Sequence, residues 1–331
     1  MLLEHIKNRT SLLISQAIVT LQLQEKPTII LGLSGGPDSV FLFHVLQSLA
    51  QEQRITLVAA HLDHQWRTES AKDVSFCSNM CIKHNIPFIA AKANSFHGAV
   101  TYNGSKEDVG RKLRRLFFEH ARVTFNAQFI SLAHHLQDQQ ETFFIRLARG
   151  TSLNGLHGMN EIDGIILRPL LRVRKQDIVS YLQAHNISYL IDPTNNSDDF
   201  LRNRIRKYVI PALHQCDSRF ERKFQTSLDK LKQEDLFLQR LAEKTFASTF
   251  VYDQVKQHYS AELTKLRALD PVLQQRVILV WLIKEKIPFA VSSNYIEEIR
   301  RFIERLNGGS HTIGTNITIH KKQKSVWIAK E

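Results

Sequence analysis

The chain has 331 residues, a formal net charge of +12 at pH 7 and 43% hydrophobic residues. This length suggests two domains, and the composition is that of a globular protein with enough apolar residues for a core. The longest plain apolar run, residues 277–283, is too short to span a bilayer, and the N-terminus lacks the apolar stretch of a secretory signal. Three cysteines form no disulfide framework, so a cytoplasmic location is expected.

Apolar residues at helical spacing predict a first helix over residues 2–23, which Pro27 ends. Short apolar runs and helical stretches then alternate. The predicted strands cover 28–33, 55–61, 87–91, 129–133 and 164–170, and the predicted helices cover 39–51, 70–84, 106–125 and 139–148. Such alternation is typical of βαβ units. The predicted fold class is therefore α/β, a Rossmann-like parallel sheet with helices on both faces.

Helical patterns dominate the chain beyond Pro211. We expect helices over about 220–249, 261–286 and 294–306, and a closing hairpin formed by 316–320 and 325–329. The predicted division is an N-terminal helix packed on the core (1–26), an α/β domain (27–215) and a mainly helical, basic domain (216–331).

The positive charge is concentrated in the second part of the chain. Residues 200–331 hold 24 Lys and Arg against 14 Asp and Glu, whereas residues 1–199 hold 20 against 18. A basic surface of this kind attracts polyanions, most commonly nucleic acid. The alternative is a charge surplus that serves solubility alone.

A glycine-rich loop, S-G-G-P-D-S at residues 34–39, lies between the first predicted strand and the next helix. Ligands of parallel sheets bind beyond the carboxyl ends of the strands. Gly35 and Gly36 let the backbone approach an anion, and the helix N-terminus with the hydroxyls of Ser34 and Ser39 supplies donors for phosphate. The lysine of a Walker A loop is missing. The alternative is a Gly-Pro turn in which Ser39 caps the helix.

Asp38 is an acid in a loop that is predicted to bind phosphate. A carboxylate and a triphosphate repel each other unless a cation lies between them, and Mg²⁺ bound to both would remove the repulsion. Helix capping by Asp38 is the alternative, and one residue can serve both purposes.

Two later segments follow strands at the same edge of the predicted sheet. One is H-L-D-H-Q-W-R at 61–67, whose two histidines have no third ligand nearby and are more typical of a turn than of a metal site. The other is A-H-H-L-Q-D-Q-Q-E-T-F-F-I-R-L-A-R-G at 133–150, in which Asp138 and Glu141 share a helix face. A helix capping box is the alternative explanation for these two acids.

A basic cluster follows the turn sequence D-P-T-N at 192–195. Arg202 and Arg206 are four residues apart and point the same way on a helix, with Lys207 beside them. Two such arginines can hold a phosphate. A solvated basic helix face is the alternative.

The loop at 34–39 resembles the signature of the PP-loop ATP pyrophosphatases, which cleave ATP between the α- and β-phosphates and adenylate a substrate. Over about residues 28–212 the motifs and their order resemble the tRNA(Ile)-lysidine synthase family, and the resemblance is weaker beyond. After the loop come H-L-D-H-Q-W-R, E-D-V-G-R-K-L-R, A-H-H-L-Q-D-Q-Q-E-T, R-P-L-L and finally D-P-T-N with R-N-R-I-R.

This resemblance implies an ATP-dependent ligation of free L-lysine to C2 of the wobble cytidine in the CAU anticodon of isoleucine tRNA. The C2 carbonyl oxygen would attack the α-phosphate of ATP, and the lysine ε-amine would then displace AMP. The product, lysidine, changes decoding from AUG to AUA. The implied ligands are ATP, Mg²⁺, lysine and tRNA, with the basic domain binding tRNA, no membrane, and a homodimer as one expectation for bacterial members.

The resemblance also implies roles for individual residues. Asp38 and Asp138 are expected to hold Mg²⁺ and to act in catalysis with Arg111 and Arg114. Asp138 and Glu141 are expected to hold the lysine ammonium. The other implied roles are ATP binding by Ser34, Gly35, Gly36, Pro37, Asp38, Ser39, His61 and His134, and phosphate or tRNA binding by Arg202, Arg206 and Lys207.

Three positions depart from the family pattern: Gln137 where many members have aspartate, Gly110 in place of alanine, and Arg115 in place of an aromatic residue. The rival functions are a PP-loop tRNA thiolase, an ATP-dependent amide synthetase subunit and a non-catalytic tRNA-binding protein. A thiolase usually needs a reactive cysteine pair or an iron–sulfur site, but Cys77 and Cys81 are spaced C-x₃-C in a predicted helix. The basic C-terminal part argues against the amide synthetase, and the intact acids argue against a protein without catalysis.

Overall fold

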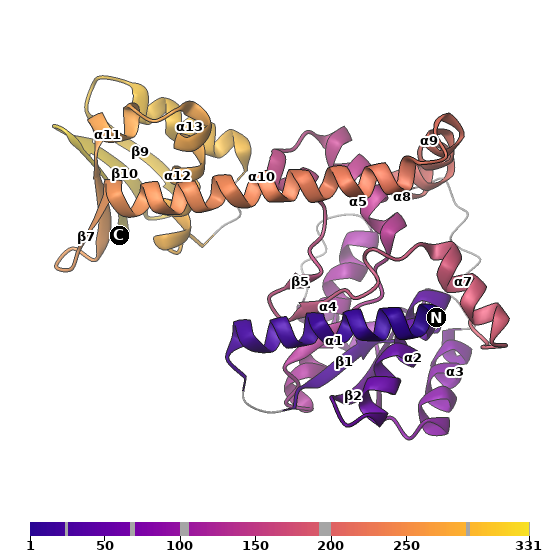
Figure 1. The fold of residues 1–331 in the computed structure, drawn as a ribbon. Coiled ribbons are helices and arrows are strands. Elements are labelled where there is room, and N and C mark those ends of the chain that lie inside the picture. Colours follow the sequence, from indigo (N-terminus) through magenta and orange to yellow (C-terminus); the bar gives the residue numbers. More distant parts are fainter. Residues whose placement is uncertain (24–25, 67–69, 100–105, 192–199, 289–291, 331) are drawn as a thin grey trace. The chain divides into compact units, whose positions relative to one another are not determined.

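The computed structural model describes residues 1–23, 26–66, 70–99, 106–191, 200–288 and 292–330. The chain divides into two compact units, each with its own sheet (Figure 1). Unit 1 comprises Met1–Ile145 and Gly158–Glu221, and unit 2 comprises Arg146–His157 and Arg222–Glu331. The division at residues 26 and 215 that we expect from the sequence stays a prediction.

Unit 1 is built on a six-stranded sheet with the order β3-β2-β1-β4-β6-β5. Five strands are parallel, and β5 pairs antiparallel with β6 at the edge. The strands are β1 (Thr28–Gly32), β2 (Thr56–Asp63), β3 (Phe88–Lys92), β4 (Phe129–Ser131), β5 (Ile162–Asp163) and β6 (Ile166–Leu167). The predicted Rossmann-like parallel sheet is confirmed. The strand order reverses between β1 and β4, which makes the carboxyl end of β1 the place where a ligand is expected.

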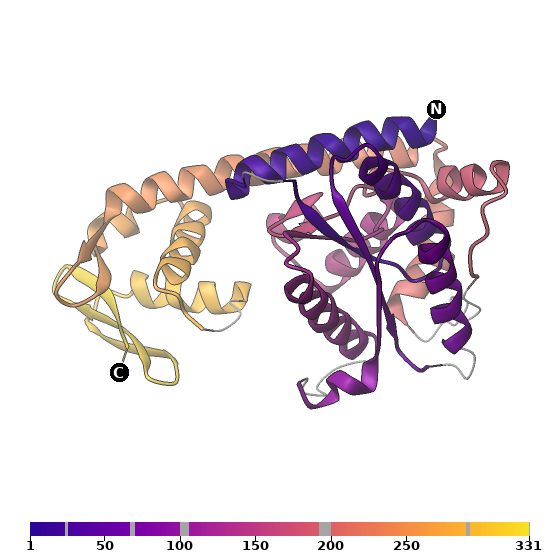
Figure 2. The same cartoon turned by 90° about the horizontal axis from the view of Figure 1, so that it is seen from below.

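Helices cover both faces of this sheet (Figure 2). Successive residues of β1 point to opposite faces. Ile29 therefore packs in one cluster with Phe41 from the helix after β1, whereas Ile30 packs in another with Phe117 from the helix before β4. The helical segments of unit 1 are α1 (Leu2–Leu21), α2 (Pro37–Gln51), α3 (Ser70–Lys83), the 3₁₀ segment Ala93–Ala99, α4 (Lys106–Thr124), most of α5 (Leu136–Arg149), α7 (Lys175–Ala184), α8 (Leu201–Arg204), the π-helical turn Ile205–Val209 and α9 (Ile210–Cys216).

Unit 2 contains a five-stranded antiparallel sheet with the order β7-β8-β11-β10-β9. Its strands are β7 (Phe250–Asp253), β8 (His258–Glu262), β9 (Gly309–Gly314), β10 (Ile317–Lys322) and β11 (Ser325–Lys330), and its helices are α6 (Leu153–Leu156), most of α10 (Phe220–Thr249), α11 (Leu263–Arg267), α12 (Pro271–Lys284) and α13 (Ser293–Glu304). The predicted closing hairpin is present as β10 and β11. The other three strands were not predicted, because β7 and β8 are short and β8 pairs with β11, far along the chain.

Asp235 on α10 explains why Arg146–His157 belongs to unit 2. This carboxylate is 2% exposed. Its Oδ1 accepts a hydrogen bond from Arg276 of α12 at 2.6 Å, and its Oδ2 accepts one from Asn154 Nδ2 at 3.1 Å and lies 3.5 Å from His157 Nε2. One buried acid therefore joins α10, α12 and the segment after α5.

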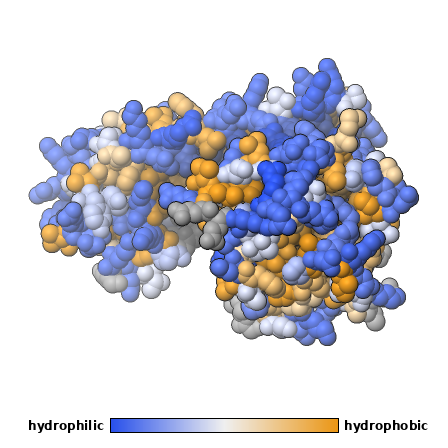
Figure 3. Space-filling view, turned by 60° about the horizontal axis from the view of Figure 1, so that its bottom comes forward, coloured by the Kyte–Doolittle hydropathy of each residue, from blue (hydrophilic) through white to orange (hydrophobic). Residues whose placement is uncertain are grey.

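In the described part of the chain, no helix combines the length and the apolar character that crossing a membrane requires. On the face drawn in Figure 3, hydrophobic residues form separate patches among hydrophilic ones in both units. Large hydrophobic side chains that are exposed include those of Val19 on α1, Phe237 on α10 and Val255 after β7.

Replacement of Asp235 by alanine should destabilise unit 2, because Arg276 would keep a largely buried charge without its partner. Removing one member of a buried ion pair costs about 3 kcal/mol. Calorimetry should show a lower Tm for the transition of unit 2. Glu243→Ala, which removes only an exposed contact with Gln239 on the same helix, is the control and should change stability by less than about 0.5 kcal/mol. An equal loss of stability in both variants would contradict the role of Asp235.

Candidate active site

The loop between β1 and α2 has the backbone of an anion-binding turn. Gly36 is the N-cap of α2 and Pro37 occupies the first helical turn. Gly35 has a φ of +82°, and a Cβ at this position would lie 2.6 Å from Leu190 Cδ1. Only glycine fits this conformation and this space. The backbone N–H groups at the start of α2 are thereby left at the carboxyl end of β1, where they can bind an anion.

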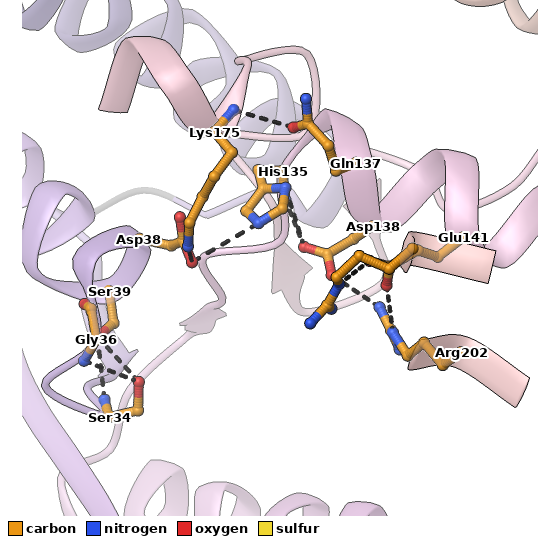
Figure 4. Close-up of polar contacts among 11 residues, drawn as sticks. Ser34, Gly36, Asp38, Ser39, His135, Gln137, Asp138, Glu141, Lys175 and Arg202 are labelled. Carbon is orange, nitrogen blue, oxygen red and sulfur yellow. Dashed lines mark hydrogen bonds and ion pairs between the residues drawn. The ribbon is translucent and has the colours of Figure 1, made fainter. Parts of the chain in front are cut away.

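Two serines stabilise the loop (Figure 4). Ser39 Oγ donates to the Gly36 carbonyl at 2.9 Å and accepts the Ser34 backbone N–H at 3.2 Å, and the two hydroxyl oxygens lie 3.1 Å apart. Ser39 is buried, so its hydroxyl maintains the shape of the loop. Ser34 is exposed and can contact a ligand.

His135 lies between the two acids that we predict to act in catalysis (Figure 4). Its Nε2 is 3.6 Å from Asp38 Oδ2, and its Nδ1 is 3.5 Å from Asp138 Oδ2. The His135 backbone N–H also donates to Asp138 Oδ2 at 2.9 Å, as in a capping box, because α5 begins at Leu136. His134 was predicted from the motif at 133–150, whereas His135, which the same motif contains, was not predicted.

Lys175, the first residue of α7, forms an ion pair with Asp38 Oδ2. Its backbone N–H donates to Gln137 Oε1 at 2.9 Å, so Gln137, one of the departures from the family pattern, helps to hold the start of α7 (Figure 4). A lysine from a helix far along the chain thus reaches the glycine-rich loop. Lys175 was not predicted, because no local motif relates it to Asp38.

Two arginines neutralise the acids of α5. Arg202 donates from Nη2 to Asp138 Oδ1 at 2.7 Å and from Nε to Glu141 Oε2 at 2.5 Å. Arg206 donates from Nε to Glu141 Oε1 at 2.6 Å. The Glu141 side chain is fully buried. Both carboxylates that we expect to bind a lysine ammonium therefore already bind cationic side chains, so this position suits a positive charge.

These charges shift the pKa values at the site. Burial favours a higher pKa for Asp138, but the nearby charges of His135, Arg202 and His134 and the hydrogen bond from the His135 N–H outweigh it and lower the pKa to about 2. Burial lowers the pKa of His134 to about 4, and the neighbouring charges of Arg168, Arg202 and Arg111 act in the same direction. Asp138 is therefore ionised and His134 neutral at pH 7.

The remaining residues that the sequence predicts for the site are His61, Arg111, Arg114 and Lys207. His61 is buried beneath the loop, with Nδ1 2.8 Å from the Leu33 carbonyl and 3.5 Å from Cys77 Sγ. Arg111 on α4 acts on His134 through its charge, and Arg114 acts in the same way on His64. Lys207 lies over the Tyr208 ring at 5.1 Å, on an exposed part of the π-helical turn. The predicted turn at 192–195 falls outside the described residues.

Three buried polar atoms at the site, Asp38 Oδ1, His134 Nδ1 and His135 Nδ1, have no hydrogen-bond partner among the residues whose positions are described. Within the same part of the chain, no three His, Cys, Asp or Glu side chains form a group that could by itself hold a metal ion. A cation here would therefore need ligands from a bound substrate as well as from Asp38.

The chain belongs to the PP-loop family, since residues 3–213 match the family model described as a PP-loop domain. It is 32% identical over 291 residues to the tRNA(Ile)-lysidine synthase of Bacillus cereus and 34% identical over 289 residues to that of Bacillus subtilis. These matches cover 86% and 85% of this chain, but only 61% and 60% of the relatives. The chain thus spans less than two thirds of their length.

Among solved structures, the U34-tRNA thiolase NcsA from Methanococcus maripaludis has a similar fold. The TM-score is 0.56 at 13% sequence identity, and the match covers 69% of this chain and 78% of the thiolase. At this identity the likeness concerns the fold alone.

His134→Gln should flatten the pH dependence of stability between pH 6.5 and about 4. The folded state lowers the pKa of His134 from 6.5 to about 4. The unfolded chain therefore binds the proton more tightly, and stability falls as the pH falls through this window. The free energy of unfolding in urea should differ less between neutral pH and about pH 5 in this variant.

His5→Gln, at an exposed histidine on α1, is the control and should keep the pH dependence of the unaltered protein. An unchanged dependence in His134→Gln would show that His134 does not titrate as expected.

Proposed function

We propose that this protein is a tRNA(Ile)-lysidine synthase, which ligates free L-lysine to C2 of the wobble cytidine in the CAU anticodon of isoleucine tRNA and uses ATP. The observation that carries the proposal is the grouping of Asp38, Asp138 and Glu141 beside the glycine-rich loop, with cations bound to all three acids. Identities of 32% and 34% to curated enzymes of this name support it. An enzyme acting on tRNA and ATP would work in the cytoplasm.

In this proposal the ATP phosphates bind at the N-terminus of α2, between Ser34 and Lys175. The orphaned Asp38 Oδ1 fits a Mg²⁺ ion, which binds proteins through one or two carboxylates and completes its ligands with substrate phosphates and water. Such an ion would neutralise charge that develops on the phosphate oxygens. Lys175 would turn from Asp38 to a phosphate oxygen. It would there supply the positive charge that the loop lysine supplies in proteins with a Walker A loop.

The reaction has two steps. The C2 carbonyl oxygen of the cytidine attacks the α-phosphorus, and the bond from that phosphorus to pyrophosphate breaks. The lysine ε-nitrogen then attacks C2, the C2–O bond breaks, and AMP leaves with that oxygen. Adenylation makes the oxygen a good leaving group, and the ammonium must lose a proton before it attacks.

Asp138 is the proposed direct ligand of the lysine ammonium. The Asp138 side chain is 14% exposed, so a ligand can reach its Oδ2, whereas the Glu141 side chain is fully buried and both of its oxygens accept from arginines. With a pKa of about 2, Asp138 stays charged and orients the ammonium, but it is a weak base. Glu141 would act by holding Arg202 and Arg206 in place.

Transfer of sulfur by a cysteine pair, as in the rival thiolase function, is less well supported. Burial raises the pKa of both Cys77 and Cys81 to about 12, so these thiols stay protonated and unreactive. The third cysteine, Cys216, is exposed and ends α9.

Asp38→Asn and Asp138→Asn should each lower lysine ligation by about a hundredfold or more, because each removes a charge next to the reacting groups. The measurement is incorporation of radiolabelled lysine into isoleucine tRNA with a CAU anticodon, with ATP and Mg²⁺, beside a methionine tRNA. Asp177→Asn is the control, because Asp177 pairs with Arg174 on the surface of α7.

Near-normal activity in either variant would contradict the site assignment. No incorporation by the unaltered protein, while it still binds the tRNA, would mean that the site serves another nucleophile, and sulfur donors would be tried next.

Lys175→Ala should raise the KM for ATP about tenfold, the effect of losing one charge-assisted contact to phosphate. The tRNA affinity should stay unchanged, and Lys175→Arg should recover part of the loss because it keeps the charge. The measurement is ATP-dependent lysine incorporation at varied ATP. Lys83→Ala, at an exposed lysine of α3, is the control. A change in kcat without a change in KM would contradict phosphate binding by Lys175.

A further inference from the structure

The sheet of unit 2 uses only one face for the core. Ala261 on β8, Val326 on β11 and Ile319 on β10 belong to the buried cluster around Trp281. Residues that alternate with these along the strands point to the opposite face. That outer face carries Trp327 on β11 and His320 on β10, which stand opposite each other in the strand pairing.

Three rings form a row across the outer face. The Trp327 ring lies 5.5 Å from the His320 ring and 6.3 Å from the His258 ring of β8, with interplanar angles of 22° and 18°. All three side chains are partly exposed. The Trp327 indole N–H donates to no residue in the described ranges, although this donor usually finds a partner in a protein. The row therefore offers an aromatic surface and a free donor together.

The neighbours of the row leave space for a further flat ring. Ser310 on β9 stands opposite His320, and Ser260 on β8 stands opposite Trp327. Both are small, and Ser310 is exposed. A planar group bound beside His320 would continue the stack over Ser310, with hydroxyl groups within reach of its edges.

The charge of this region favours an anionic partner. Residues 222–331 hold 19 Lys and Arg against 12 Asp and Glu, a net charge of +7. Lys322, two residues from His320 on the same face, and Lys324 in the following turn are both exposed. The nearby acids already form ion pairs. Asp253 Oδ2 lies 3.9 Å from Lys256 Nζ, and Glu262 Oε2 lies 3.7 Å from Lys265 Nζ.

We propose that this face binds an unpaired nucleobase of the tRNA, which stacks at the His320–Trp327 end of the row while the adjoining phosphate lies near Lys322. Sheets that display aromatic side chains bind single-stranded RNA in this way, and basic residues follow the phosphates. The inference rests on the proposed function, because it takes tRNA as the substrate. It adds an anchoring subsite on unit 2, distinct from the candidate active site on unit 1.

Trp327→Ala should weaken tRNA binding about tenfold, because stacking of one base on an aromatic side chain has roughly that effect. Trp327→Phe should lose less tRNA affinity, because an aromatic ring remains. The salt dependence of tRNA binding should be the same in both Trp327 variants as in the unaltered protein. It should be smaller in Lys322→Ala, which loses a phosphate contact. Val251→Ala is the matched control, because Val251 is an exposed apolar residue of the same sheet face that lies outside the row.

A fluorescence experiment tests stacking directly. In Trp66→Phe the remaining indoles are those of buried Trp281 and of Trp327. A short single-stranded oligocytidylate should quench the fluorescence of this variant, and the quenching should be lost in Trp66→Phe/Trp327→Phe. Quenching that persists in the double variant would overturn the proposal. So would an unchanged tRNA affinity in folded Trp327→Ala, or a change in its oligomeric state without a change in affinity.

Lysine incorporation separates this inference from the proposed function. If both hold, Trp327→Ala raises the KM for tRNA and keeps kcat at saturating tRNA. If the unaltered protein incorporates no lysine and Trp327→Ala still loses tRNA affinity, the subsite stands and the proposed function fails. If lysine is incorporated and Trp327→Ala has an unchanged KM for tRNA, the subsite alone is overturned.

Discussion

Neutralisation of three carboxylates at one edge of the parallel sheet is the constraint on which the candidate site depends. Asp38 lies in the glycine-rich loop, His135 links it to Asp138, and Arg202 links Asp138 to Glu141, whose side chain is fully buried. Uncompensated charges in such surroundings would destabilise the fold by several kcal/mol each. The compensating cations come from later in the chain, since Lys175 begins α7, Arg202 lies on α8 and Arg206 lies in the π-helical turn after it. Charge pairing thus folds the segment after β6 over the acids.

The same pairing gives the site its chemical character. The pKa of Asp138 is lowered to about 2, so this carboxylate stays negatively charged at neutral pH, whereas burial keeps His134 neutral. A phosphate at the start of α2 would bring negative charge next to Asp38. The Asp38–Lys175 ion pair could then open, with Asp38 binding a metal ion and Lys175 binding that phosphate. Side chains that stabilise the fold without substrate can in this way become substrate contacts when it arrives.

Unit 2 shows a different use of buried charge. Asp235, held by Arg276 and Asn154, brings the segment that continues from α5 into the core of this unit. Helix α5 carries Asp138 and Glu141 in unit 1, and its last residues, from Arg146 on, belong to unit 2. On the outer face of the unit 2 sheet, Trp327 and two histidines form a row instead.

The amino-acid sequence by itself determined the alternation of strands and helices, the glycine-rich loop and the acids of α5. These features depend on hydrophobic periodicity and on residue types at fixed spacing, both of which are local. Only the tertiary structure decided that Lys175 meets Asp38, 137 residues away, and that Arg202 meets Glu141, 61 residues away. It also decided the pairing of β8 with β11. Such contacts depend on how distant segments pack, and no local spacing of residue types specifies the partner of a charge or of a strand edge.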